Sequence, residues 1–158
     1  FSDIRNESNV PLDNFYWRDI LPTDAVTLRT ISTGTWNEEL KYTIYYKTNL
    51  VSEERALAER LSTSTNNTID CSASAVKLKA GEVITEIRFD FGTVQPGFEP
   101  LTNPYITCLV HPDLPHEYRF KNCTDVGGER GDEWVIDKNC WVTVIYAVPK
   151  GKLPKTGN

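Results

Sequence analysis

Val83-Ile84-Thr85-Glu86-Ile87-Arg88-Phe89-Asp90-Phe91 is a nine-residue stretch in which apolar and polar side chains alternate with a period of two. Because successive side chains of a β-strand point to opposite faces, the odd-numbered residues from Val83 to Phe91 share one face. Glu86, Arg88 and Asp90 then share the other face. The pattern predicts a strand that packs one face against a core and exposes the other to water.

Similar runs, rich in β-branched and aromatic residues, occur along much of the chain and are typical of short strands. They predict strands at Val26–Ile31, Leu40–Tyr46, Tyr105–His111, Glu117–Lys121, Glu133–Ile136 and Trp141–Val148. Pro and Gly mark the turns between them, including one predicted at Val126-Gly127-Gly128. Only two stretches favour helix, namely Ser52–Leu61 by its composition and Ser72–Leu78 as a single turn before Gly81.

The predicted fold class is therefore all-β, an antiparallel β-sandwich with at most one or two short helical turns. We expect one sandwich domain at residues 1–148 and a flexible tail at residues 149–158, which combine Pro, Gly and Lys with little to bury. The chain contains no Met and begins within a polar and apolar pattern at Phe1. We therefore expect it to be a piece of a longer protein with further domains upstream.

The charge of the chain restricts its partners. The formal net charge is −5 and the sequence pI is about 5.1, so no basic surface for nucleic acid or anionic lipid is expected. The longest apolar runs are a few residues, whereas a helix that crosses a bilayer needs about 20. The sequence thus predicts neither a nucleic-acid partner nor a membrane span.

Four cysteines, an even number, suit an exported protein with one or two disulfides. Cys123 and Cys140 flank a segment that is expected to form a hairpin-like excursion, and we favour a bond between them. Cys71 and Cys108 are expected either to pair across the sheets or to remain buried thiols, with a slight preference for the bond. No C-x-x-C pair is present, so no zinc site is expected.

The most specific motif lies at the end of the sequence, where Leu153-Pro154-Lys155-Thr156-Gly157 matches the L-P-x-T-G pattern. This motif resembles the recognition signal of sortases, which join surface proteins to the cell wall of Gram-positive bacteria. The resemblance implies that a sortase thiolate attacks the carbonyl of Thr156, and that an amine of the wall precursor then releases the acyl-enzyme. In complete signals an apolar segment and a basic tail follow this motif.

Several further motifs resemble the membrane-proximal, Ig-like C-terminal domain of sortase-anchored surface proteins of Firmicutes, including adhesins and pilin-like proteins. They are Ser8-Asn9-Val10-Pro11-Leu12-Asp13-Asn14-Phe15, Asp19-Ile20-Leu21-Pro22-Thr23-Asp24-Ala25-Val26, Thr33-Gly34-Thr35-Trp36, Tyr45-Tyr46-Lys47-Thr48-Asn49, Phe91-Gly92-Thr93-Val94, Pro96-Gly97-Phe98 and Asp125-Val126-Gly127-Gly128.

This resemblance implies a non-enzymatic stalk or spacer, located in the cell wall outside the cell. The implied partners are sortase, transiently, and peptidoglycan, covalently at Thr156. Upstream domains would bind any host protein or glycan. The alternative is that this domain itself binds a host protein or glycan through aromatic side chains. Trp17, Trp36, Trp134 and Trp141 are the candidates for that surface, although core positions are commoner for aromatic residues in β-domains.

Stalk domains of this kind often contain an autocatalytic Lys–Asn isopeptide bond beside a buried carboxylic acid. The candidates in this sequence are Lys41 or Lys47 as the amine and Asn139 as the amide, with Glu86 or Asp90 as the acid. Two groups offer alternatives for metal binding: the acidic residues at Asp125, Glu129, Asp132 and Asp137, and the histidines at His111 and His116. A solvated loop is the better interpretation of each, so we expect no metal site and no cofactor.

Overall fold

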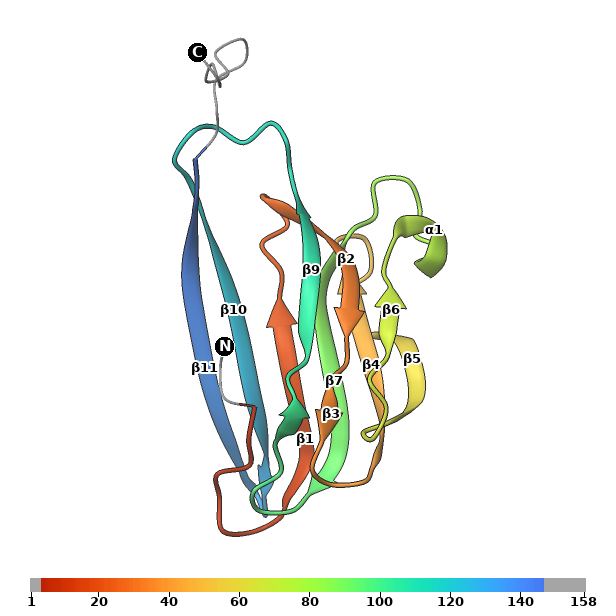
Figure 1. The fold of residues 1–158 in the computed structure, drawn as a ribbon, viewed down its shortest axis with the longest axis vertical. Helices are drawn as coiled ribbons and strands as arrows, with labels where there is room; N and C mark the ends of the chain where they lie inside the picture. The colour runs from red at the N-terminus through yellow and green to blue at the C-terminus, as the bar shows by residue number, and fades with distance from the viewer. Residues whose placement is uncertain (1–3, 147–158) are drawn as a thin grey trace, which may run out of the picture.

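Residues 4–146 are described by the computed structural model, and nearly all the regular structure in them is β-strand. The strands are β1 (Leu12–Ile20), β2 (Val26–Ser32), β3 (Thr35–Trp36), β4 (Lys41–Thr48), β5 (Arg55–Ser62), β6 (Thr68–Asp70), β7 (Ile84–Val94), β8 (Pro100–Thr102), β9 (Tyr105–Val110), β10 (Tyr118–Arg130) and β11 (Glu133–Ile145). One helical turn, α1 (Ala73–Val76), lies between β6 and β7. The all-β prediction is confirmed (Figure 1).

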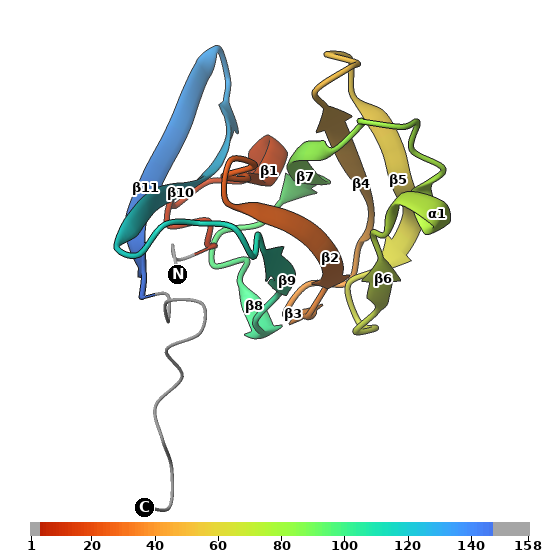
Figure 2. The same ribbon diagram turned by 90° about the horizontal axis from the view of Figure 1, so that it is seen from above.

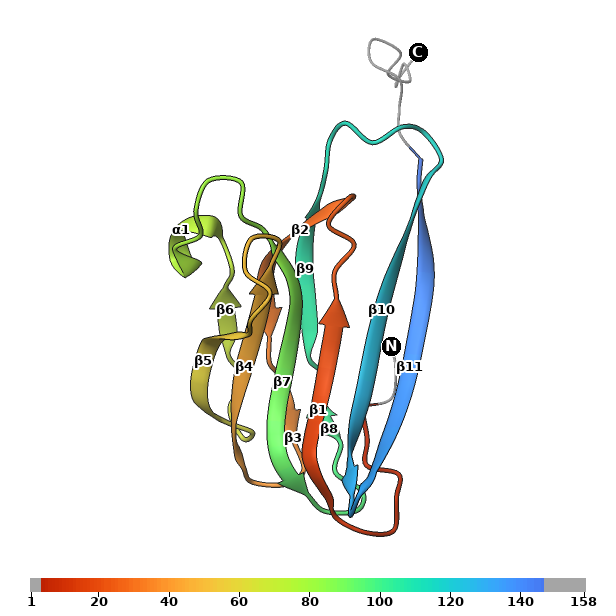
Figure 3. The ribbon, with the colours of Figure 1, turned by 180° about the vertical axis from the view of Figure 1, so that it is seen from behind.

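The strands form three antiparallel sheets. The largest has six strands in the order β11-β10-β1-β7-β4-β5, and Figure 3 shows them side by side from behind. A three-stranded sheet, β6-β2-β9, and a two-stranded sheet, β3-β8, lie across from it. Seen from above in Figure 2, the two small sheets cover one face of the large sheet. Within the three-stranded sheet, β9 is the strand closest to the β10–β11 hairpin.

The core lies between these layers, and the alternation in β7 explains how it is filled. Ile87, Phe89 and Phe91 are almost fully buried, while Arg88 on the opposite face forms ion pairs. One detail of the prediction is wrong. In the ladder with β4, Thr48 pairs with Ile84 and Lys47 pairs with Glu86, so Thr85 is an extra residue that forms a bulge. As a result, Ile84 is buried at the place that was expected for Thr85.

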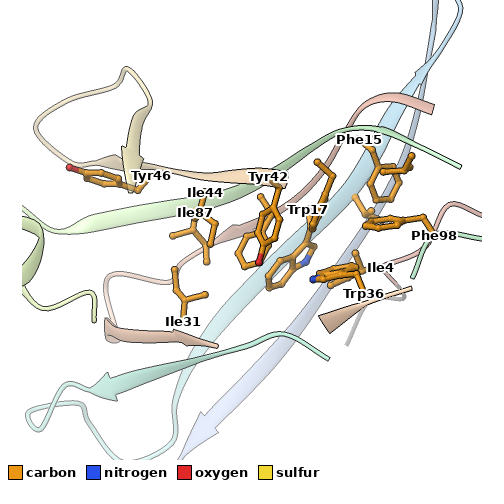
Figure 4. Packing of buried hydrophobic residues seen from close by; sticks show 14 of the residues in the cluster. Ile4, Phe15, Trp17, Ile31, Trp36, Tyr42, Ile44, Tyr46, Ile87 and Phe98 are labelled. Carbon is orange, nitrogen blue, oxygen red and sulfur yellow. The ribbon is translucent and has the colours of Figure 1, made fainter. Parts of the chain in front are cut away.

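Aromatic rings fill much of the core (Figure 4). Trp36 stacks on Phe98 with ring centroids 5.2 Å apart, and Trp17 meets Phe89 edge to face at 5.0 Å. Such offset and edge-to-face pairs stabilise a core beyond the area that they bury. Trp17 and Trp36 are therefore core residues, which leaves only the other two tryptophans as candidates for a surface site.

Strand β1 was not predicted, although it lies in the middle of the large sheet between β10 and β7. Its central residues Phe15, Tyr16 and Trp17 are all buried, because both faces of the strand are covered at this point. Asn14 lies in an irregular part of the strand, where the ladder to β10 shifts register and the backbone has a φ of 50°. A run of three aromatic residues shows no period-two alternation.

One predicted helix is confirmed and the other is wrong. Helix α1 begins after Ser72, whose hydroxyl accepts a hydrogen bond from the N–H of Ala75 as an N-cap. The stretch Ser52–Leu61 is not a helix, since β5 occupies Arg55–Ser62 and pairs with β4 at the edge of the large sheet. Strand pairing and the packing of Leu57 and Leu61 against the core outweigh the helix propensity of the Ala, Glu and Arg residues.

The end of the described chain is one long hairpin rather than several short strands. β10 and β11 pair along thirteen residues each, and the reversal occurs at Gly131, with a φ of 61°, and Asp132. The predicted turn at Val126-Gly127-Gly128 is therefore wrong. A side chain at Gly127 would put its Cβ 2.7 Å from the carbonyl oxygen of Val135, so glycine permits close strand packing here.

Within residues 4–146 the structure has no helix that is long and apolar enough to cross a membrane, since α1 has only four residues. The predicted tail at residues 149–158 lies outside the described residues.

Candidate functional site

The five residues of the predicted sortase motif, Leu153 to Gly157, lie outside the described part of the chain. The motif therefore remains a prediction from the sequence. The last described strand, β11, ends at Ile145, eight residues before Leu153.

The predicted disulfide between Cys123 and Cys140 is confirmed. The two cysteines are directly opposite each other in the β10–β11 ladder, and their Cα atoms are 4.1 Å apart. The segment between the cysteines is a hairpin, as expected, but the strands also extend past the bond, which therefore crosses the middle of the β10–β11 ladder. Disulfides persist in oxidising compartments, so this bond is typical of a protein outside the cytoplasm.

The second predicted pair is not formed, and Cys71 and Cys108 are free thiols. They lie on opposite sides of β2: the N–H of Cys71 donates to the carbonyl of Arg29, while Cys108 is the partner of Leu28. Two strand spacings separate them, about 10 Å, and a disulfide requires Cα atoms within about 7 Å.

Burial, as the main cause, raises the thiol pKa to about 12 for Cys71 and about 11 for Cys108. Neither is a nucleophilic thiolate at neutral pH.

The residues proposed for an isopeptide bond are not brought together. Lys41 and Lys47 are on β4 and Asn139 is on β11, with β7, β1 and β10 between these strands. Four strand spacings amount to about 19 Å. The two candidate acids have other partners, since Glu86 lies 3.8 Å from the ammonium of Lys47 and Asp90 lies 3.5 Å from the guanidinium of Arg88.

A cleft opens where the two layers differ in width. The six-stranded sheet extends past the edge of the three-stranded sheet, so the inner face of the β10–β11 hairpin is not covered by β9, as Figure 2 shows. The resulting space, which we name the hairpin cleft, has a volume of about 310 Å³. Its walls come from β1, β9, β10 and β11 and include Trp17, Asp19, Tyr105, Phe120, Asn122 and Trp141.

Asp19 is the unusual residue of the hairpin cleft. Its side chain projects from the same face of β1 as Trp17, and the residue is only 3% exposed. The Asn122 side chain donates to the carboxylate, but Oδ1 of Asp19 is buried with no hydrogen-bond partner in the part of the chain that the structure describes. Burial raises the pKa of Asp19 to about 6, and the hydrogen bond from Asn122 only partly opposes this. Asp19 was predicted as part of a motif but not as a site residue.

Aromatic rings and polar groups both line the cleft that contains Asp19. The indole Nε1 of Trp17 is also buried, with no hydrogen-bond partner among residues 4–146. Trp141, from β11, is 39% exposed and forms part of the outer wall. Apolar surface with a few polar groups is typical of a binding site for a small ligand or a side chain.

The outer face of the same hairpin carries a different group of residues. Asp125 is buried and accepts hydrogen bonds from Tyr16 at 2.6 Å and from Nε of Arg18 at 2.9 Å. Trp134 is 50% exposed and its ring meets that of Tyr16 edge to face, with centroids 6.2 Å apart. Because Asp125 is neutralised by Arg18 at 2.9 Å, this group is a structural network with one exposed aromatic residue.

The aromatic walls and the carboxylate of the hairpin cleft are suited to binding a ligand. Among the described residues no histidine lines this cleft, and its cysteine, Cys108, is a protonated thiol. Across residues 4–146 there is also no group of three or more His, Cys, Asp or Glu side chains placed to hold a metal ion. One signal of the site was visible in the sequence. Phe15, Trp17 and Asp19 are spaced two residues apart, so in a strand the carboxylate of Asp19 lies on the same face as the two aromatic side chains.

No model of a known protein family matches this chain, and neither the curated proteins nor the solved structures contain a match to it.

Proposed function

We propose that this chain is a non-enzymatic, wall-proximal stalk or spacer module of a Gram-positive surface protein, an adhesin or a pilin-like protein. In this proposal a sortase joins the module covalently to peptidoglycan at Thr156. Sortase is a transient partner, and peptidoglycan is the permanent one. The location is the cell wall, outside the cell.

The observation that carries this proposal is the motif Leu153-Pro154-Lys155-Thr156-Gly157 after the last strand of a folded domain. A sortase requires an extended peptide, and seven residues, including Pro149 and Gly151, separate β11 from Leu153. The thiolate of the enzyme attacks the carbonyl carbon of Thr156, and the Thr156–Gly157 amide breaks. Gly157 leaves as an amine, and an amine of the wall precursor then replaces the thiolate.

Two features of the folded part support an extracellular spacer. The disulfide between Cys123 and Cys140 suits an oxidising environment. The antiparallel sheets, packed face to face, are the architecture that Ig-like stalk domains share, and we include an Ig-like relationship in the proposal.

A second candidate function is direct binding of a host protein or glycan. It is favoured by the exposure of Trp134 and Trp141, which lie on opposite faces of one hairpin. Binding of the isolated domain to a matrix-protein or glycan array, lost on Trp134→Ala or Trp141→Ala, would support this function. Absence of binding on such arrays would count against it.

A transpeptidation assay tests the anchoring proposal. The chain is incubated with a class A sortase and an oligoglycine amine, and intact mass is measured. We expect a product in which oligoglycine is attached to Thr156, with loss of Gly157-Asn158. Leu153→Ala should abolish the reaction, whereas Lys155→Ala, at the variable position of the motif, should react like the native chain. No product from the native chain, or equal reaction of both variants, would contradict the proposal.

A further inference from the structure

We propose that the hairpin cleft binds a primary alkylammonium group, of the kind carried by a lysine side chain in an extended peptide, with Asp19 as its counter-charge. The proposal concerns the folded domain and does not depend on the sortase motif.

The first argument is a comparison of the buried carboxylates. Three acidic side chains are buried in residues 4–146, namely Asp19, Glu82 and Asp125. Glu82 is paired with Arg55 at 2.6 Å, and Asp125 is paired with Arg18 at 2.9 Å. Buried acids of this domain are thus neutralised by a cation, and Asp19 is the exception among the described residues. Among residues 4–146, no Lys, Arg or His side chain lines the cleft that contains it.

The second argument is that the carboxylate lines a cleft that a ligand can enter. Asp19 is one wall of an open cleft of about 310 Å³, near the lower limit of ordinary ligand pockets. Its buried Oδ1 has no hydrogen-bond partner within the described part of the chain, so an ammonium group that reaches it would satisfy this acceptor. A carboxylate or phosphate ligand would instead be repelled by Asp19 and by the net charge of −5.

The third argument is the character of the walls. Trp17, Phe120 and Trp141 contribute aromatic surface, and Val26 and Ile106 contribute aliphatic surface. Aromatic faces attract cations, and an aliphatic stem behind the charge buries apolar area in the same space. An alkylammonium ion has both properties, whereas a hydrated metal ion has no apolar part.

The fourth argument favours a lysine in a peptide over a simple amine. Trp17 Nε1 is a buried donor with no partner in residues 4–146. Trp17 precedes Asp19 by two residues on the same face of β1, a rise of about 7 Å. The ligand should therefore carry an acceptor at some distance from its ammonium, as a lysine residue does in its backbone carbonyl. β9 pairs with β2 on one edge only, so its other edge offers backbone groups to an extended peptide.

The test uses two peptides, acetyl-Thr-Val-Lys-Val-Thr-amide and the same peptide with norleucine in place of lysine. Each is titrated into the isotopically labelled chain, and the indole N–H signals are followed by NMR. We expect the lysine peptide to shift the Trp17 and Trp141 signals and to bind at least about tenfold more tightly than the norleucine peptide.

Two variants complete the test. Asp19→Asn should reduce lysine-peptide affinity to the norleucine level while the remaining spectrum stays native. Glu59→Gln removes the same charge from exposed β5, at the opposite edge of the sheet, and should bind like the native chain. Equal affinity for both peptides, unchanged affinity of the Asp19→Asn chain, or no binding of either peptide would overturn the proposal.

Discussion

Replacement of Asp19 by Asn is expected to stabilise the domain at neutral pH, although most substitutions of buried residues destabilise a protein. The change keeps the size of the side chain and removes its charge. Asp19 is 3% exposed and lacks the arginine partner that neutralises Asp125. The hydrogen bond from Asn122 compensates only in part for the desolvation of its ionised form, which is therefore a cost to the folded state.

The magnitude follows from the raised pKa of Asp19. The folded-state value is about 6, against an ordinary value of 3.8. A difference of this size lowers the free energy of unfolding by up to about 3 kcal/mol once the pH exceeds 6. The Asn side chain brings its own unpaired N–H, which offsets part of the gain. We therefore expect the variant to be more stable by about 1 to 3 kcal/mol near pH 7.5.

The direction in which the stability difference changes with pH shows whether the Asp19 carboxylate causes it. Because the pKa of Asp19 is higher in the folded state than in the unfolded state, its stabilising contribution is complete below the unfolded value and is lost as the pH rises through 6. As the pH falls from about 7.5 to 4, the native chain should thus gain up to about 3 kcal/mol of stability relative to the variant. The difference then shrinks to zero and reverses by the cost of the Asn N–H. Cys108 is the other titratable group that faces Asp19, and it stays protonated over this range because its pKa is about 11.

Urea unfolding followed by tryptophan fluorescence, repeated at several pH values, measures this difference. Glu59→Gln serves as the matched control and should lie within about 0.5 kcal/mol of the native chain throughout. The reasoning is refuted if Asp19→Asn is less stable than the native chain near neutral pH. It is also refuted if the difference does not change with pH, because the carboxylate would then have a compensating partner.

Three further predictions concern the hairpin and the free thiols. Replacing Cys123 and Cys140 together by Ala opens a loop with a sequence separation of 17, and should lower the free energy of unfolding by about 3 kcal/mol in urea titrations. Gly127→Ala places a methyl group 2.7 Å from the carbonyl oxygen of Val135, and should cost about 1 to 3 kcal/mol in the same measurement. Intact mass after alkylation without reduction should show two modified cysteines in urea and slow modification of both in buffer, because the free thiols are protonated and largely buried.

Local pattern identified the strands that bury one face. β7 is such a strand, with Phe89 in the core and Arg88 on the outer face, so its alternation was visible in the sequence. β1 is covered on both faces around Tyr16, and its composition gave no period to detect. β5 has the composition of a helix, and only its pairing with β4 makes it a strand.

The hairpin cleft is harder to predict, because it arises where the two packed layers differ in their number of strands. It exists since the large sheet has six strands and the facing sheet has three, and no single segment contains that information. The disulfide was predictable from the spacing of Cys123 and Cys140, because hairpin partners are close in sequence. The separation of Cys71 from Cys108 depends on β2 lying between them, which is a property of the sheet order.

The position of the disulfide limits how far a pulling force can open the domain from its C-terminal side. Force applied through the residues after Ile145 would peel β11 from β10, beginning at the Tyr118–Ile145 pair. Five residue pairs separate before the peeling reaches Cys123 and Cys140, where a covalent bond replaces hydrogen bonds. The load then passes into β10 at Cys123, which pairs with Ile20 in the middle of the sheet. The hairpin beyond the bond, and the turn at Gly131, are shielded from the tension.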